Sequence, residues 1–382
     1  MDKDILYVGV DDNDIELFEG QFVVENGMSY NSYIIMDDKI CIMDSVDKNF
    51  KDEWINNVKK ALNGKKPTYL VVSHMEPDHS ANIMALCDEY KDITVVYTQK
   101  ASQMALQFFN RKPNNELIIK ENDTLDLGKH KLQFIAAPMV HWPEVMFTYD
   151  SVSKTLFSAD AFGKFGALSF DDPEGWACEA RRYYFGIVGK YGQQVQTVLK
   201  KVSQLEINTI CPLHGPILED DLSYYLNTYD TWSKYESESK GVFIAYASVY
   251  GNTEKACLLL KEMIEKTGTH VSIADMTDED FHESIEDAFR YDRLVLASVT
   301  YNGTIFPVMN NFIEALLERN YQNKKIAFIE NGSWAPQTAK LMEAKFQNSK
   351  NIEVVEPKVK IVGGVNDSVI SQLEALSNAL KD

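Results

Sequence analysis

Residues 241–382 alternate five times between short apolar runs and amphipathic helical patterns, and this alternation limits the possible folds more than any other feature. The strand-like runs are residues 242–247, 270–276, 293–299, 325–331 and 351–362; the helical patterns are residues 253–266, 281–290, 306–320, 334–347 and 367–380. Repeated βα units form a parallel sheet with helices on both faces. We therefore predict a doubly wound, five-stranded α/β domain.

The preceding part of the chain does not show this regular alternation of strand-like and helical segments. Strand-like runs at residues 69–73, 131–138, 155–160 and 208–212 are short, apolar and rich in β-branched or aromatic residues, with helical patterns such as residues 80–90 between some of them. A chain of 382 residues exceeds the usual size of one domain. The regular βα alternation begins after the polar stretch SKYESESKG, so we predict two domains, residues 1–240 and residues 241–382.

Charge and cysteine content exclude several classes of protein. A formal net charge of -19 repels phosphate backbones, so we expect no nucleic-acid partner, whereas a basic or small partner protein is compatible with it. The five cysteines form no Cys-x-x-Cys pair, which argues against thiolate zinc, a rubredoxin-type iron site or a disulfide framework. With no signal-peptide pattern and no apolar run of membrane length, the chain is expected in a reducing cytoplasm, away from membranes.

A dense cluster of ionisable side chains follows the run at residues 69–73. The segment VVSHMEPDHSAN, residues 71–82, contains His74, Glu76, Asp78 and His79 on an expected loop at a strand's carboxyl end, with Ser80 as the expected N-cap of the next helix. Three more candidates stand at the ends of other strand-like runs: His141, Asp160 and His214. Four loops could therefore meet at one edge of a sheet.

Four imidazoles and three carboxylates exceed what one divalent ion needs, so the count favours two metal ions that share a carboxylate. Nitrogen and oxygen ligands suit iron, manganese or zinc, and three anionic ligands favour a metal that passes through a trivalent state. The alternative is a solvated loop with scattered histidines. No other candidate metal ligands cluster near the remaining histidines in the sequence, so we expect these to be ordinary surface or strand residues: His130, His270 and His282.

Three loops in the second part are candidates for binding a cofactor. The first follows the strand at residues 242–247 and precedes a helix, where hydroxyls and backbone amides form an anion site; it lacks the Walker and Gly-x-Gly-x-x-Gly patterns, and a plain turn would also explain it. The other two follow later strands, at the edge where open α/β sheets bind ligands. The loops comprise Ser248, Val249, Tyr250, Gly251, Asn252 and Thr253; Thr300, Tyr301, Asn302 and Gly303; and Asn331, Gly332, Ser333 and Trp334.

These motifs carry a family resemblance. The pattern His-x-Glu-x-Asp-His with the three later ligands resembles the metallo-β-lactamase-like domain of flavodiiron proteins, also called A-type flavoproteins, and NGMSYNSYII, residues 26–35, resembles the family's N-terminal strands. The three loops resemble the FMN site of a flavodoxin. The implied fold is a metallo-β-lactamase-like αββα sandwich followed by a flavodoxin-like parallel sheet. Related hydrolases usually have histidine where Glu76 stands, which makes Glu76 the most discriminating residue.

The resemblance implies roles for single residues. One iron would be bound by His74, Glu76 and His141, and the other by Asp78, His79 and His214, with Asp160 bridging. FMN would lie on the three loops. Trp334 would either pack against the flavin or cover the core. Many members have a histidine before the segment at residues 26–35. Here the stretch reads Phe18-Glu19-Gly20-Gln21, so a proton-delivery role of that histidine cannot be transferred. Tyr183 and Tyr184 are candidates for hydrogen bonding near the irons, or for core packing.

The implied activity is reduction of O2 to water, of NO to N2O, or of both. Because the chain ends shortly after the fifth βα unit, we expect a separate rubredoxin or similar protein as electron donor, and a head-to-tail homodimer or a dimer of dimers in which each flavin meets the partner's irons. Two alternatives stay open: a binuclear zinc hydrolase fused to a flavodoxin domain, and an electron carrier or sensor with a degenerate metal site.

Overall fold

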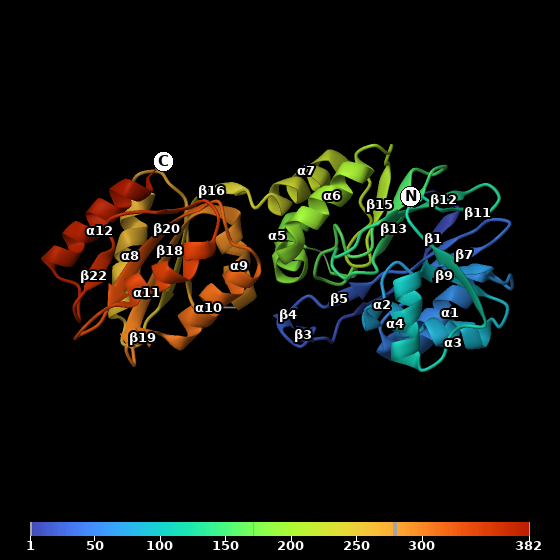
Figure 1. The fold of residues 1–382 in the computed structure, drawn as a ribbon, viewed down its shortest axis with the longest axis horizontal. Helices are drawn as coiled ribbons and strands as arrows, with labels where there is room; N and C mark the ends of the chain where they lie inside the picture. The colour runs from blue at the N-terminus through green and yellow to red at the C-terminus, as the bar shows by residue number, and fades with distance from the viewer. Residues whose placement is uncertain (1, 171, 278–280, 382) are drawn as a thin grey trace. The chain divides into compact units, whose positions relative to one another are not determined.

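A computed structural model describes residues 2–170, 172–277 and 281–381 (Figure 1). The chain divides into two compact units, Met1–Asp230 and Thr231–Asp382. Helix α7, Leu222–Ser233, runs across this division. The domain limits predicted from the polar stretch before residue 241 remain a prediction.

The first unit is built on two larger sheets. The six-stranded sheet has the order β1-β6-β7-β8-β9-β10, and the five-stranded sheet has the order β11-β12-β13-β14-β15. The strands are β1 (Ile5–Tyr7), β6 (Tyr33–Ile35), β7 (Cys41–Met43), β8 (Tyr69–Val71), β9 (Thr94–Thr98), β10 (Asn115–Ile119), β11 (Thr124–Asp126), β12 (Lys131–Ala136), β13 (Met146–Asp150), β14 (Thr155–Phe157) and β15 (Thr209–Cys211). Strands β2 (Val10–Asp12) and β5 (Met28–Tyr30) form a separate pair, as do β3 (Leu17–Phe18) and β4 (Phe22–Val23).

The two sheets share one apolar core. Buried side chains of the first sheet, such as Ile35 and Val71, belong to the same cluster as Phe134 and Phe157 of the second. Figure 1 shows helices along the outer sides of the sheets: α1 (Lys51–Leu62), α3 (Ile83–Glu89), α4 (Gln99–Phe109), α5 (Trp176–Tyr183), α6 (Gly192–Val202) and α7. This is the αββα sandwich that the family resemblance implies.

Strand directions bring three loops to one edge of the second sheet. Strand β13 is antiparallel to both β12 and β14, whereas β14 and β15 are parallel. Strands β12, β14 and β15 therefore end at the same edge, and each is followed by one predicted metal ligand: His141, Asp160 and His214. The predicted runs locate these strands but extend past them, because the last residues of each run belong to the loops.

The run from His74 to His79 is not entirely a loop, which corrects one expectation. Pro77–Ser80 forms a short helix, α2, and proline suits its first position because the missing N–H has no partner inside a helix. Ser80 therefore ends a helix and donates to the Met75 carbonyl oxygen over 2.8 Å, rather than capping the next one. Asn82 stands at the N-terminus of α3 instead.

The second unit has a parallel sheet in the order β17-β16-β18-β20-β21, as the βα repeat predicts. Its strands are β16 (Ser239–Ala247), β17 (Val271–Asp275), β18 (Tyr291–Tyr301), β20 (Lys324–Asn331), β21 (Ile352–Val354) and β22 (Val359–Ile361), with β19 (Thr304–Ile305) antiparallel to β18. The predicted last strand, residues 351–362, is interrupted: β21 and β22 pair separately with β20. Pro357 lies between them and has no N–H to donate to a ladder.

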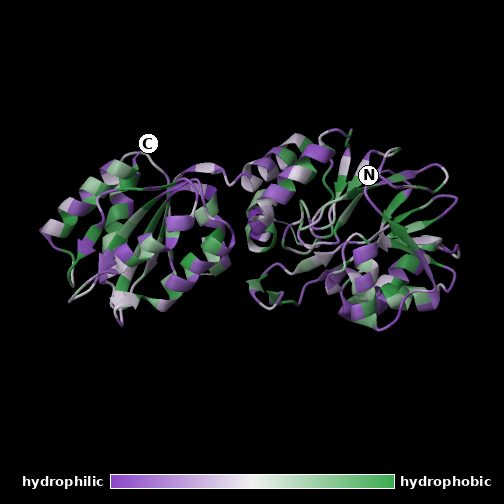
Figure 2. Cartoon of the chain, in the orientation of Figure 1, coloured by the Kyte–Doolittle hydropathy of each residue, from purple (hydrophilic) through white to green (hydrophobic). Residues whose placement is uncertain are grey.

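Helices surround this sheet, and their apolar sides face it, as the colouring in Figure 2 shows. They are α8 (Asn252–Glu265), α9 (Phe281–Arg290), α10 (Pro307–Glu318), α11 (Thr338–Lys345) and α12 (Asp367–Leu380). Side chains of α8 and α12, such as Leu260 and Leu373, form a buried cluster with Ile244 and Ile329 of the central strands. Helix α11 starts four residues later than predicted, which leaves Trp334 in the loop after β20.

Candidate metal centre and cofactor loops

Four side chains from three loops form the first group of possible ligands. The Glu76 Oε2 atom lies 3.1 Å from His74 Nε2 and 3.0 Å from His141 Nε2. The Asp160 Oδ2 atom lies 3.2 Å from each of the same two nitrogens. Two imidazole nitrogens and two carboxylate oxygens thus point at one small volume, with His74 fully buried.

Three side chains form a second group beside it. The Nε2 atoms of His79 and His214 are 3.0 Å apart, and the Asp78 Oδ2 atom lies 3.3 Å from each of them. The other Asp160 oxygen, Oδ1, lies 3.3 Å from His79 Nε2 and 3.9 Å from His214 Nε2. Asp160 therefore presents one oxygen to each group, which is the arrangement of a carboxylate shared by two metal ions.

The buried oxygens of this cluster lack hydrogen-bond partners among the described residues. Both carboxylate oxygens of Asp78 and both of Asp160 are buried without one. Buried polar atoms in folded proteins are almost always satisfied, so four such oxygens beside converging imidazoles indicate a cation-binding site. Although burial alone would raise it, the pKa of Asp160 lies well below its usual value because His74 stands next to it. The residues present fit two divalent metal ions.

The three candidate cofactor loops also lie at one edge. The first follows β16, but the other two begin inside strands: Thr300 and Tyr301 are the last residues of β18, and Asn331 is the last residue of β20. The three strands are neighbouring and parallel. In the first loop, Gly251 has a positive φ of 79° and its N–H donates to the Ser248 hydroxyl over 3.1 Å, which turns the chain into α8. The Thr253 hydroxyl is buried at the start of α8 and accepts a hydrogen bond from Asn331 of the third loop over 3.2 Å.

The aromatic side chains of these loops are exposed. Tyr250 is 91% exposed, Trp334 is 82% exposed and Tyr301 is 47% exposed. Gln337, which sequence reasoning missed, connects the second and third loops: its backbone N–H donates to Thr300 Oγ1 over 3.0 Å and its side chain donates to the Gly303 carbonyl over 2.8 Å. Open apolar faces beside a helix N-terminus fit a flat ring that carries a phosphate.

Two family profiles match the chain, in the order of its two units. The ODP family beta lactamase profile matches residues 28–215, and the flavodoxin domain profile matches residues 243–365. The nitric oxide reductase of Moorella thermoacetica is 32% identical over 362 residues, covering 92% of this chain and 90% of that protein. This chain belongs to the flavodiiron protein family.

Solved structures share the fold of this chain, and a further relative matches most of its length. The structure of rubredoxin oxygen:oxidoreductase from Desulfovibrio gigas superposes with a TM-score of 0.92 at 23% identity, covering 100% of this chain and 96% of that one. The flavodiiron protein from Giardia intestinalis gives 0.91 at 25% identity, with the same coverage. A putative diflavin flavoprotein of Synechocystis is 28% identical over 91% of this chain, but the chain spans only 60% of that protein's length.

Side chains outside the ligand set hold it in place. The Glu144 Oε1 atom accepts hydrogen bonds from His74 Nδ1 over 2.8 Å and from the Met75 N–H over 2.9 Å, and Glu144 is 3% exposed. His214 Nδ1 donates to the Ser29 carbonyl over 2.7 Å. Such bonds fix the ring so that the opposite nitrogen faces the metal. Sequence reasoning missed both partners, although Glu144 follows His141 in the same loop.

The two tyrosines named from the sequence differ in their surroundings. The Tyr183 ring lies 5.5 Å from the His214 ring, and burial, followed by the charge of Asp160, raises the pKa of Tyr183 well above its usual value. The Tyr184 ring packs against those of Phe185 and Tyr229, 5.1 Å and 5.0 Å away. Tyr183 is thus the one of the two that lies beside the metal ligands.

The stretch without a histidine still contributes to the centre. Phe18 ends β3, and its ring lies 5.4 Å from the His214 ring. The Glu19 residue that follows is exposed, yet partial loss of contact with water and the neighbouring Glu76 carboxylate raise the pKa of its side chain to about 7.

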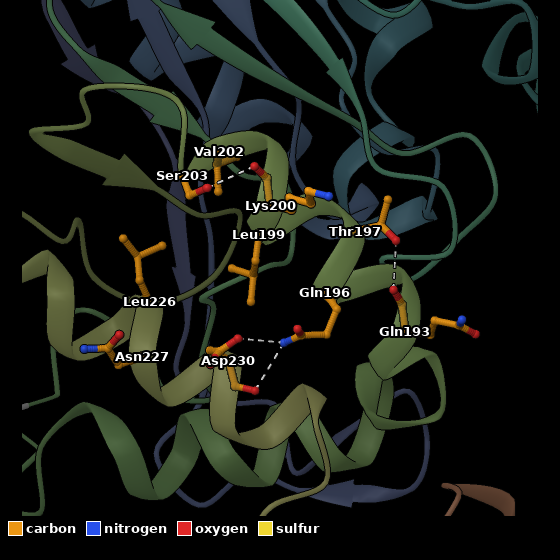
Figure 3. A pocket seen from close by; sticks show the side chains of 10 residues that line it. All are labelled: Gln193, Gln196, Thr197, Leu199, Lys200, Val202, Ser203, Leu226, Asn227 and Asp230. Carbon is orange, nitrogen blue, oxygen red and sulfur yellow. Dashed lines mark hydrogen bonds between the residues drawn. The ribbon is translucent and has the colours of Figure 1, made fainter.

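A separate surface hollow of about 600 Å³ lies between α6 and α7. Figure 3 shows Gln196 on one wall donating to Asp230 on the other, over 2.8 Å. Its lining contains none of the seven candidate ligands; it consists of Gln193, Gln196, Thr197, Leu199, Lys200, Val202, Ser203, Leu226, Asn227 and Asp230.

Among the described helices, none is both long and apolar enough to cross a membrane.

Proposed function

We propose that this chain is a flavodiiron oxidoreductase that reduces O2 to water, NO to N2O, or both. The observation that carries the proposal is the pair of ligand groups sharing Asp160, combined with a flavodoxin domain in the same chain. Relatives named nitric oxide reductase and rubredoxin oxygen:oxidoreductase support it. Reduction of O2 to two waters takes four electrons and four protons; reduction of two NO to N2O and water takes two of each.

Iron and FMN, when bound, supply these electrons. The side chains of this protein hold and orient them. One iron would be bound by His74, Glu76 and His141, and the other by Asp78, His79 and His214, with Asp160 between them. The three carboxylates offset the positive charge of the ions. The aromatic ring of Phe18 against His214 keeps water from that side of the cluster.

Three segments of the second unit would bind FMN. The backbone N–H groups and hydroxyls of residues 248–253, at the N-terminus of α8, would bind the FMN phosphate. The loops Thr300–Gly303 and Asn331–Trp334 would lie on either side of the isoalloxazine ring. Thr253 and Asn331 are held together by their hydrogen bond, which supports a preformed site.

A zinc hydrolase would use the same loops, but two observations favour the reductase. Glu76 contacts both His74 and His141, so a carboxylate occupies the position where related hydrolases usually have histidine. Membership of the flavodiiron family also accounts for the flavodoxin domain. The test is to quantify iron, zinc and FMN in the purified protein and, after anaerobic reduction, to measure O2 and NO consumption in parallel. Zinc with esterase or lactamase activity and no gas consumption would overturn the proposal.

We further propose a separate rubredoxin as electron donor, a reducing cytoplasmic location and a head-to-tail homodimer. Cys41, Cys87, Cys211 and Cys257 form no disulfide, which supports the location. In the proposed dimer, each flavin serves the irons of the partner chain. Mixing Asp160→Ala chains with Thr253→Glu chains under subunit exchange then restores activity in the heterodimer. Inactive mixed dimers would favour electron transfer within one chain.

A further inference from the structure

His130 was expected to be an ordinary surface or strand residue, and the structure shows otherwise. The side chain is fully buried in the turn between β11 and β12, and its Nδ1 donates to Asp150 Oδ2 over 2.7 Å. Asp150 is itself fully buried and accepts the N–H groups of Val152 and Ser153 over 3.1 and 3.2 Å. A buried carboxylate thus fixes the ring and leaves Nε2 free to act as an acceptor.

The opposite nitrogen, His130 Nε2, lies beside the Asp4 carboxylate. It is buried without a hydrogen-bond partner among the described residues, and the Asp4 Oδ2 atom lies 3.6 Å away, too far for a hydrogen bond. Asp2, Asp4 and His130 each offer a ligand atom, and these three atoms lie within 4.8 Å of one another. Two ligands of a tetrahedral zinc ion stand about 3.4 Å apart, so the gap between Asp4 and His130 suits a shared ion.

Charge around the three residues favours a cation. Asp37 adds a nearby carboxylate, which accepts the N–H groups of His130 and Lys129 over 2.7 and 3.1 Å. Lys129 now neutralises Asp4 through its Nζ. Its side chain is 50% exposed and flexible, so it can withdraw to solvent when an ion binds.

We propose that Asp2, Asp4 and His130 form a second, structural metal site that takes one divalent transition ion of the zinc type, completed by water. The imidazole excludes Mg²⁺ and Ca²⁺ as preferred ions, because both favour oxygen ligands only. Asp2 and Asp4 precede β1, an edge strand of the six-stranded sheet, whereas His130 precedes β12 of the five-stranded sheet. The ion therefore ties the two sheets of the sandwich together near the N-terminus.

The test uses the full chain loaded with iron and FMN, to which zinc sulfate is added before removal of free ion and elemental analysis. We expect one additional zinc per chain with iron content unchanged, and a zinc-dependent rise in Tm. The double variant Asp2→Asn/Asp4→Asn should bind this zinc at least about 10-fold more weakly and lose the rise. Its matched control is Asp52→Asn/Asp92→Asn, which removes two charges from exposed positions and should behave like the wild type.

Three results would overturn the proposal. The first is that the wild-type protein binds no zinc in addition to the metal it contained before zinc sulfate was added. The second is zinc uptake that equals iron loss, since the ion would then have entered the centre at Asp160. The third is equal uptake by both double variants. Because the Asp2 and Asp4 side chains lie at the surface end of the site, their replacement tests the site without removing the buried His130.

Discussion

The two cofactor regions of this protein are built on opposite principles. The proposed metal centre consists of buried ionisable side chains, among which Asp160 is 1% exposed and His74 is fully buried. The flavin loops consist of backbone amides, hydroxyls and aromatic rings, among which Tyr250 is 91% exposed. In the proposed function, one site would bind its ions through charges held in the interior, and the other would bind FMN through neutral groups held at a sheet edge.

This difference determines how strongly a single substitution should affect each site. Buried carboxylates and imidazoles hold each other at fixed distances only when all are present, since removing one leaves the rest unpaired in a medium of low dielectric constant. Exposed loops share the binding of a large ligand among many weak contacts, so the loss of one contact costs less. Substitutions in the metal centre should therefore have larger effects than substitutions in the flavin loops.

The largest effect is expected for Asp160→Ala. The shared carboxylate would be lost to both ions at once, so the purified variant should contain almost no iron, and gas consumption should fall by more than about 100-fold. FMN content should stay at the wild-type level, because the flavin loops belong to the other unit. Iron analysis and flavin absorbance check both points; full iron retention would refute the shared role of Asp160.

The second-largest effect is expected for Thr253→Glu, which tests the flavin loops. Thr253→Glu places a carboxylate at the buried N-terminus of α8, where the FMN phosphate is proposed to bind, and repulsion of the like charges should weaken FMN binding by about 100-fold. Thr253→Ser, which keeps the hydroxyl, is the control. Titration of the apoprotein with FMN, followed by flavin fluorescence, gives both affinities. Iron content should not change, and equal FMN affinity of both variants would place the phosphate elsewhere.

A smaller effect is expected for Glu144→Gln. The amide oxygen can still accept from His74 Nδ1, but the lost charge makes the imidazole a weaker ligand, so iron should dissociate about 10-fold more readily. Competition with a chelator measures this, and the Mössbauer spectrum of one iron should change while that of the other stays. Glu89→Gln, at an exposed position, serves as the control. Spectra identical to those of the wild type would show that Glu144 has only a packing role.

The smallest effect is expected for Trp334→Ala. An aromatic contact contributes about 0.5–1.5 kcal/mol, so FMN affinity should fall by roughly twofold to tenfold. Leu258→Ala removes another exposed apolar side chain of the same unit and should leave the affinity unchanged. A loss as large as that caused by Thr253→Glu would contradict the view that the loops share the binding among many contacts.

Local patterns made much of the protein predictable. The βα repeat after residue 241 identified the parallel sheet, because hydrophobic period and turn residues are read within one element. The run from His74 to His79 was recognisable as a candidate metal site because its ionisable residues lie close together in the sequence. The same local reasoning failed where a short signal was ambiguous: Ser80 looked like an N-cap but ends α2, and Pro357 divides the strand predicted at residues 351–362.

The sequence by itself therefore determined the fold class, the order of the domains and the types of ligand available, because these depend on neighbours in the chain. Only the tertiary structure decided which atoms meet. The two oxygens of Asp160 face different histidine groups, Glu144 aligns His74, and Gln337 joins two loops. His130 likewise looked isolated until folding placed it between Asp150 and Asp4, which are 20 and 126 residues away in sequence. Such contacts depend on how strands pair and sheets pack, and no local pattern records that information.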